Sequence, residues 1–171
     1  SVHFFHIKGI YSAILCAKRG HNVTLYEKTD KLGGVFIAAS APAFKEKDRD
    51  LIAWYIRELK KYPITINMNT EVKDIKSLGA DEVIIATGSA PKRIPVKGAD
   101  KAIEACEYLL KTKSVGENVV VVGGGLVGLE VAEYLSGHAD EITVVEMQDK
   151  VAKDLGQLRK ILNDKEIKNE E

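Results

Sequence analysis

Cysteine is scarce in this sequence. The 171 residues include two cysteines, Cys16 and Cys106, and neither belongs to a CxxC or CxxH pair. A structural zinc site, a cysteine-ligated iron–sulfur cluster and a redox disulfide all need thiols at closer spacing. We therefore expect no metal site and two free thiols buried in helices, an arrangement that fits the cytoplasm.

The sequence also has no excess of charge and no long apolar run. Its 25 Lys and Arg residues balance its 25 Asp and Glu residues, so the formal net charge is zero. Without a basic surplus, nucleic acid is not an expected partner. No apolar run reaches the ~20 residues that span a bilayer, and the N-terminus lacks a signal-peptide layout, so no membrane association is expected. With 45% hydrophobic and 29% charged residues, the composition is that of a globular protein with a packed core.

Strands and helices are expected to alternate along the chain. Short segments rich in β-branched residues predict strands, and apolar residues at helical spacing predict helices. The predicted strands are residues 22–27, 64–72, 82–86, 118–122 and 141–146. The predicted helices are residues 48–62, 102–111 and 126–136, and residues 158–171 form a charge-rich tail that is helical at most. Trp54 lies on an apolar helical stripe and is expected in the core. The alternation predicts an α/β fold of Rossmann-like, three-layer parallel-sheet units.

An internal repeat divides the chain into two similar parts. A shift of 119 residues superimposes Gly9 on Gly128 and Glu27 on Glu146. We therefore expect two incomplete dinucleotide-binding subdomains, residues 1–95 and 114–171, joined by a linker or crossing at residues 96–113.

The strongest motif is GGGLVG at residues 123–128, which fits G-x-G-x-x-G. It follows an apolar strand, opens a helix and precedes an acidic residue at the end of the next strand, which is the context of a dinucleotide fingerprint. Gly123 permits the tight turn, Gly125 lets the backbone approach a pyrophosphate, and Gly128 lets the helix pack closely on the strand. A purely structural glycine-rich turn is the alternative that this context disfavours.

The helix start and Glu146 complete this motif. The N–H groups of Leu126 and Val127 are expected to face the phosphates, with support from the helix dipole. Glu146 can accept hydrogen bonds from both ribose hydroxyls, and its charge would repel a 2′-phosphate. The second part of the chain is therefore predicted to bind NAD(H) rather than NADP(H).

The first part of the chain keeps the acid but not the glycines. By the repeat, Phe4 and His6 stand where Gly123 and Gly125 stand, and their side chains would fill the volume of a pyrophosphate. Two interpretations stay open. Either a dinucleotide binds here with Glu27 on its ribose, or the unit is retained for packing and Glu27 is merely solvated.

Four stretches of the sequence resemble a known family. They are GHNVTLYEKTDKLGGVFIAASAPAFKEKDRDLIAWY, NTEVKDI, DEVIIATGSAP and NVVVVGGGLVGLEVAEYL. They resemble the C-terminal half of the 2-enoate reductase and 2,4-dienoyl-CoA reductase flavoproteins, relatives of trimethylamine dehydrogenase. In that family this region takes hydride from a nicotinamide onto FAD, and a preceding barrel reduces the double bond of an enoate or enoyl-CoA.

The resemblance implies that residues 1–95 are FAD-binding-like and residues 114–171 NAD(H)-binding-like. By this resemblance, Glu27 and Lys28 would contact the adenosine ribose of FAD, and Gly33 and Gly34 would lie at its phosphates. Val72 would contact the adenine through its backbone, and Thr87 and Gly88 would form a loop that closes over the FAD.

The function implied is that of the electron-input region of an NADH-dependent flavoprotein oxidoreductase. No residue pair fits a general acid and base for double-bond reduction, so no catalytic residue is assigned, and a fragment incomplete for turnover is expected. The alternatives are an ADP- or NAD-binding module without redox chemistry, and a remnant domain that folds without binding. An open sheet edge predicts association with another copy of the chain.

Overall fold

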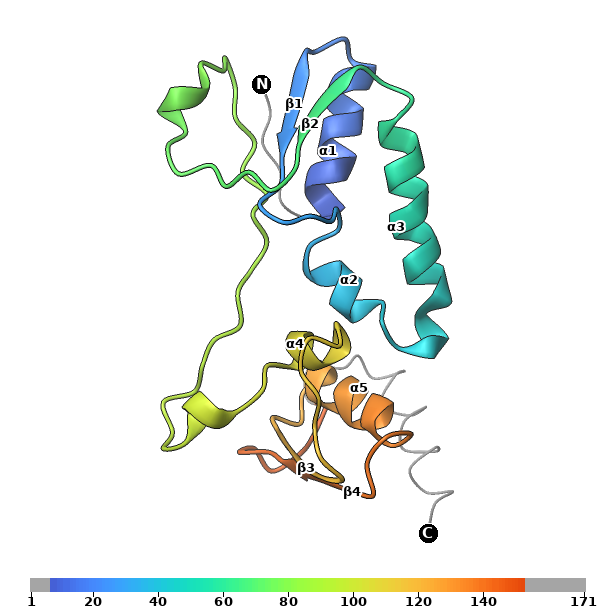
Figure 1. Ribbon diagram of the computed structural model, residues 1–171, viewed down its shortest axis with the longest axis vertical. Helices are drawn as coiled ribbons and strands as arrows, with labels where there is room; N and C mark the ends of the chain where they lie inside the picture. Colours follow the sequence, from blue (N-terminus) through green and yellow to red (C-terminus); the bar gives the residue numbers. More distant parts are fainter. Residues whose placement is uncertain (1–6, 153–171) are drawn as a thin grey trace. The chain divides into compact units, whose positions relative to one another are not determined.

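A computed structural model of the chain describes residues 7–152. The chain divides into two compact units, Ser1–Ala102 and Ile103–Glu171. Each unit contains one pair of strands among the described residues (Figure 1). The predictions made for Phe4, His6 and the tail at residues 158–171 lie outside the described residues.

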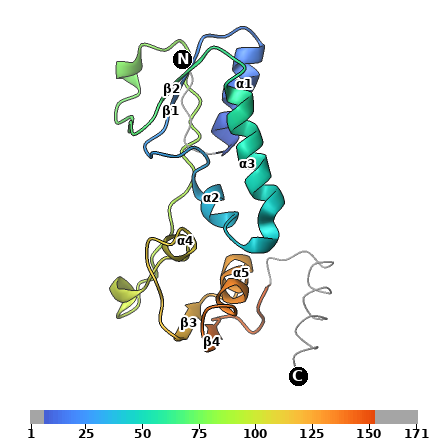
Figure 2. The same ribbon diagram turned by 45° about the vertical axis from the view of Figure 1, so that its right-hand side comes forward.

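The first unit is built on two parallel strands joined by a long crossover. Its elements are α1 (Ile7–Lys18), β1 (Val23–Tyr26), α2 (Val35–Ala39), α3 (Glu46–Leu59) and β2 (Ile64–Asn67), with a 3-10 turn at Ala43–Lys45. Strands β1 and β2 pair in parallel with Val23 opposite Ile64. Because parallel neighbours cannot be joined by a tight hairpin, α2 and α3 fill the connection between them. Helices α1 and α3 run side by side in both side views (Figure 2).

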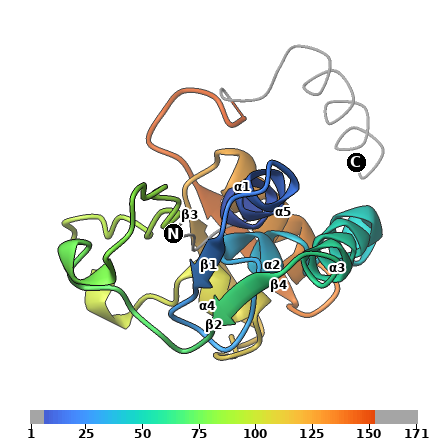
Figure 3. The ribbon, with the colours of Figure 1, turned by 90° about the horizontal axis from the view of Figure 1, so that it is seen from above.

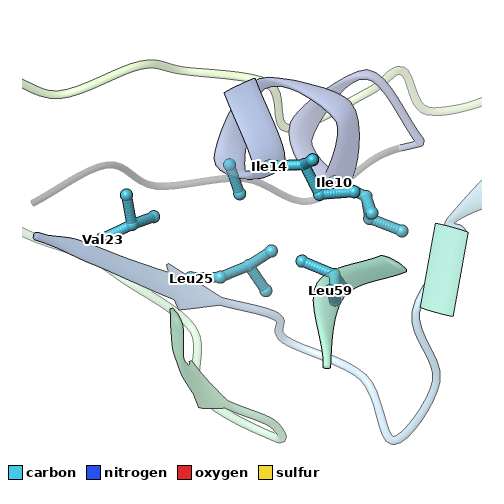
Figure 4. Close-up of a cluster of buried hydrophobic side chains, with 6 residues drawn as sticks. Ile10, Ile14, Val23, Leu25 and Leu59 are labelled. Carbon is cyan, nitrogen blue, oxygen red and sulfur yellow. The ribbon is translucent and has the colours of Figure 1, made fainter. Parts of the chain in front are cut away.

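A small apolar core holds this first unit together. In α1 the buried apolar residues recur at helical spacing, and in β1 alternate residues turn inward, so the two elements bury matching faces. Figure 4 shows these side chains pointing toward one another. The core residues are Ile10, Ala13, Ile14, Val23, Leu25 and Leu59.

The other side of the β1–β2 pair carries a long irregular segment. Seen from above, α1 and α3 lie on one side of the two strands and residues 68–95 on the other (Figure 3). Apart from a 3-10 turn at Lys76–Leu78, this segment has no helix or strand. The strand predicted at residues 82–86 is therefore wrong. Residues 83–86 are apolar, but Ile85 is 65% exposed and no neighbouring strand pairs with it. A strand needs a pairing partner as well as a favourable composition.

The second unit repeats the same arrangement on a smaller scale. Its elements are α4 (Ala105–Leu109), β3 (Asn118–Val122), α5 (Leu126–Leu135) and β4 (Glu141–Val145). Strands β3 and β4 pair in parallel, with Asn118 opposite Glu141 and Val122 opposite Val145, and α5 is the crossover. Helix α4 packs on α5, where the rings of Tyr108 and Tyr134 meet edge-on at 5.8 Å.

Only one face of the β3–β4 pair is covered by the described residues. Val121 and Val144 are half-buried, and α5 places Val131 and Leu135 in the interior. On the opposite face, Val120 and Val122 are exposed. The second unit therefore has a thinner core than the first.

The predicted α/β fold of Rossmann-like parallel units is confirmed, and neither sheet is closed. The repeat is visible in the backbone, since β1 and β4 end 119 residues apart, at Tyr26 and Val145. Several details differ from prediction. Strand β2 ends at Asn67 rather than residue 72, α3 spans residues 46–59 rather than 48–62, and α4 is shorter than residues 102–111. Trp54 is 44% exposed rather than in the core. The open sheet edges are present, and association through them stays a prediction.

Within residues 7–152, no helix is long and apolar enough to cross a membrane. The same residues contain no group of three or more His, Cys, Asp or Glu side chains placed to hold a metal ion. Cys16 and Cys106 are free, as expected, but both are half-buried rather than fully buried.

Candidate dinucleotide site

The connection between β3 and α5 is a tight turn. Gly123 follows the last residue of β3 and adopts φ of +110°, a conformation that residues with a side chain rarely take. The Gly123 amide donates to the Val145 carbonyl oxygen at 2.8 Å, so the turn stays attached to β4. Gly125 then caps α5, with an extended backbone. Gly123 therefore has the turn role that the motif predicts.

Gly128 allows α5 to pass very close to this turn. A Cβ atom on Gly128 would lie 1.7 Å from the Gly123 carbonyl oxygen, which is a backbone atom that no side-chain rotation can move away. Val121 of β3 is the next neighbour, at 3.7 Å. The third glycine of the motif is thus required by close packing between the helix and the turn.

Leu126 and Val127 form the first turn of α5. The first N–H groups of a helix have no partner further along the helix and point out of its N-terminal end, where the dipole places about half a positive charge. A pyrophosphate placed beside the glycine turn would meet these groups. The role of the α5 start in phosphate binding stays a prediction.

Glu146 directly follows β4 and lies at this loop. One oxygen, Oε2, accepts a hydrogen bond from the Gly124 amide at 2.7 Å. The other, Oε1, accepts from the Gln148 amide at 2.9 Å. The carboxylate is half-buried. Its orientation is fixed from both ends by backbone donors, as positioning of a ribose would require.

Three residues next to Glu146 had not been expected from the sequence. A Cβ on Gly124 would lie 2.8 Å from Val151 Cγ1 and 3.1 Å from Glu146 Cβ. The Ala152 amide donates to the Gly124 carbonyl oxygen at 2.8 Å. The fingerprint leaves position 124 unspecified, so the only signal for it was that this position is itself a glycine.

In the first unit, Glu27 has the same place after β1. The Thr29 amide donates to Glu27 Oε1 at 2.9 Å, and the Thr29 hydroxyl lies 2.8 Å from the same oxygen. The Glu27 amide donates to Asn67 O and its carbonyl accepts from the Thr70 amide, which brings the end of β1 beside the segment leading to Val72. Glu27 is only 2% exposed, so the interpretation of a solvated carboxylate is wrong.

The other residues implied for FAD are spread over loops of the first unit. Gly33 and Gly34 precede α2 with φ of +128° and +56°, so both adopt conformations that favour glycine. Of the remaining positions, Val72 is half-buried. The others, Lys28, Thr87 and Gly88, are exposed. The glycine pair fits a phosphate-binding loop, but the Glu27 carboxylate does not fit a ribose in this arrangement because almost none of it is accessible.

Two groups with shifted pKa values lie on α4. Burial, and to a lesser extent the Glu104 carboxylate, raise the pKa of the Cys106 thiol. Burial, and to a lesser extent Tyr134, raise the pKa of the Tyr108 hydroxyl. Both shifts keep these groups protonated at neutral pH, so neither supplies a nucleophile or a base.

Together, the parallel strands, the glycine turn and the crossover helix define an α/β protein with a Rossmann-like fold. Residues 9–170 match the family described as pyridine nucleotide-disulphide oxidoreductase. The chain belongs to that family.

Several relatives are oxidoreductases by name. A cinnamate reductase of Clostridium sporogenes is 44% identical over 85% of this chain and 22% of its own length. An NADH oxidase of Thermoanaerobacter brockii is 39% identical over 86% of this chain and 24% of its own length. A solved 2-naphthoyl-CoA reductase complex superposes with a TM-score of 0.86 and 28% identity, over 96% of this chain and 26% of that chain. The resemblance to the FAD- and NAD-binding region of 2-enoate-reductase-like flavoproteins is thus confirmed, and the chain spans about a quarter of the length of these relatives.

Proposed function

We propose that residues 118–146 bind the ADP half of NAD(H), and that the chain is the electron-input region of an NADH-dependent flavoprotein oxidoreductase. The observation that carries this proposal is the Glu146 carboxylate, held 2.7 Å from the Gly124 amide at the turn where α5 begins. An acid fixed at a glycine turn is the arrangement that binds a ribose beside a pyrophosphate.

Each residue of the site has one task in this proposal. The start of α5 holds the pyrophosphate, Gly123 and Gly128 keep the turn tight, and Glu146 accepts hydrogen bonds from the ribose hydroxyls. The nicotinamide supplies a hydride when the dinucleotide is bound. The residues described here bind and orient; the site supplies no proton donor of its own.

The proposal favours NADH over NADPH for an electrostatic reason. The 2′-phosphate of NADPH would lie against the ionised Glu146. Two like charges 4 Å apart repel by about 4 kcal/mol at the effective dielectric of a protein surface. NADH places neutral hydroxyls there instead, and these can donate to the carboxylate.

The test is a fluorescence titration of the chain with NADH and NADPH. We expect Glu146→Ala to weaken NADH binding by tenfold or more, since hydrogen bonds to a charged group contribute ~1.5–3 kcal/mol. The same substitution should narrow the gap between NADH and NADPH because the repulsion is removed. Glu141→Ala removes an equal charge from an exposed position in β4 and serves as the control. Unchanged affinity for both nucleotides in Glu146→Ala would contradict the proposal.

We also propose that the chain works as part of a longer protein, and that this longer protein reduces a carbon–carbon double bond conjugated to a carboxylate or thioester. The support is the similarity to a cinnamate reductase and to a 2-naphthoyl-CoA reductase. NADH consumption by the longer protein with cinnamate, but not with its saturated analogue, is the expected result. No consumption with any enoate or enoyl thioester would contradict it.

A second candidate is an NAD-binding module that holds no flavin. The observation that favours it is the buried Glu27, which cannot reach a ribose in this arrangement. The visible absorbance of the purified chain separates the two candidates. A yellow protein supports the flavoprotein, whereas a colourless protein that still binds NADH supports the module.

A further inference from the structure

The segment after β4 folds back over the glycine turn. We call residues 147–152 the strap. Its last residue, Ala152, is 8% exposed and donates its amide hydrogen to the Gly124 carbonyl oxygen at 2.8 Å. Ala152 adopts φ of +56°, a conformation uncommon for a residue with a side chain, which indicates that its surroundings fix it there.

The strap also contacts Gly124 through a side chain. A Cβ on Gly124 would lie 2.8 Å from Val151 Cγ1, closer than any normal contact. It would also lie 3.1 Å from Glu146 Cβ. Because the backbone of Gly124 does not need a left-handed conformation, the reason for glycine here is the room taken by Val151 and Glu146 rather than the turn itself.

Glu146 lies between the turn and the strap and is bonded to both. Its Oε2 accepts from the Gly124 amide at 2.7 Å, and its Oε1 accepts from the Gln148 amide within the strap at 2.9 Å. Gly124 is therefore held at its amide by Glu146 and at its carbonyl by Ala152. Any displacement of the strap would move the carboxylate and the turn together.

We propose that the strap is a positioning element of the nucleotide site, and that the room which Gly124 leaves for Val151 and Glu146 is needed for full NADH affinity and for the preference for NADH over NADPH. The proposal rests on the proposed function. Its physical basis is that a hydrogen bond to a ribose depends steeply on distance and angle, so a shift of the Glu146 carboxylate weakens binding without removing any contact residue. Gly124, Val151 and Ala152 act through Glu146 and are positioning residues.

The test is a double-mutant cycle on the full chain, read by NADH and NADPH titration. Gly124→Ala forces the new methyl group against Val151, and we expect it to weaken NADH binding about tenfold, the loss of one hydrogen bond to a charged group. Val151→Ala alone should change the affinity by less than about threefold, because it only removes two methyl groups from a half-exposed position. The double variant should recover part of the lost affinity, since the 2.8 Å contact with Val151 no longer exists and only the 3.1 Å approach to Glu146 Cβ remains.

The controls separate positioning from general damage. Gly116→Ala adds a methyl group in the same unit with nothing within 4 Å, so its affinity should equal that of the wild type. The NADH-to-NADPH ratio should fall in Gly124→Ala and recover in the double variant, which a mere loss of folded protein would not produce. Equal weakening in Gly124→Ala and in the double variant would overturn the proposal, as would full affinity in Gly124→Ala.

Amide hydrogen exchange of Ala152 tests the strap without any nucleotide. We expect slow exchange in the wild type, faster exchange in Gly124→Ala and recovery in the double variant. Fast exchange of the Ala152 amide in the wild type would contradict the proposal that the strap is held against the glycine turn. A wild-type chain with a protected Ala152 amide and no NADH binding would contradict the proposed function and, with it, the role of the strap in affinity.

Discussion

Glu27 and Glu146 occupy equivalent places in two units of similar design, yet their carboxylates have different surroundings. Glu27 is almost fully buried and bonds within its own turn, to the Thr29 amide and hydroxyl. Glu146 is half-buried and joins two separate segments, the glycine turn and the strap. The two turns each contain the same kind of hydrogen bond: the amide two residues after the acid donates to Oε1 of that acid at 2.9 Å.

This difference shows that an acid after a strand serves two purposes. A carboxylate satisfied by its own turn and shielded from solvent stabilises the turn, because a buried charge needs several donors. A carboxylate that is partly accessible and fixed at a helix start can also meet a ligand. Glu27 in the first unit has the surroundings of a carboxylate that stabilises its own turn, and contact with a ligand is the role proposed for Glu146 in the second unit.

The largest expected effect comes from Gly128, the glycine at which α5 passes close to the turn of the second unit. Gly128→Ala would place a methyl group 1.7 Å from the Gly123 carbonyl oxygen. We expect the free energy of unfolding to fall by more than ~3 kcal/mol and NADH binding to be lost, since only a backbone shift can relieve the overlap. Urea unfolding and NADH titration measure the two effects. Gly137→Ala, with nothing within 4 Å, is the matched control and should behave as the wild type.

A smaller effect separates the two acids. Glu27→Ala removes the acceptor of the Thr29 amide and hydroxyl in a buried place, and we expect a loss of about 2–3 kcal/mol in the free energy of unfolding. NADH affinity should stay within about twofold, because Glu27 lies in the other unit. Glu146→Ala should show the opposite pattern, with a small loss of stability and a large loss of affinity. Weaker NADH binding in Glu27→Ala, at full stability, would remove the distinction between the units.

The sequence predicted the second unit better than the first. Strand β3 has the predicted bounds, and β4 and α5 each end one residue early. These elements are fixed locally, because an apolar strand, a glycine turn and an amphipathic helix follow one another directly. The strand predicted at residues 82–86 failed because pairing depends on a partner that composition cannot reveal.

The site was also predicted in part. Gly123 and Gly128 have the roles expected of them, since a turn and a close helix approach are encoded by the motif. The prediction for Trp54 was wrong and the packing requirement at Gly124 was missed, for related reasons. The exposure of Trp54 depends on which face of α3 meets α1, and the requirement at Gly124 comes from Val151, 27 residues away in sequence. Neither tertiary contact leaves a periodic trace in the sequence.

The most direct test of the account is amide hydrogen exchange of the full chain with and without NADH. We predict that NADH slows exchange in residues 123–128 and around Glu146, where the turn and α5 meet the ADP half. Residues 27–34 of the first unit should exchange at the same rate in both samples. Slowed exchange at residues 27–34 with none at residues 123–128 would contradict the assignment of the NADH site to the second unit.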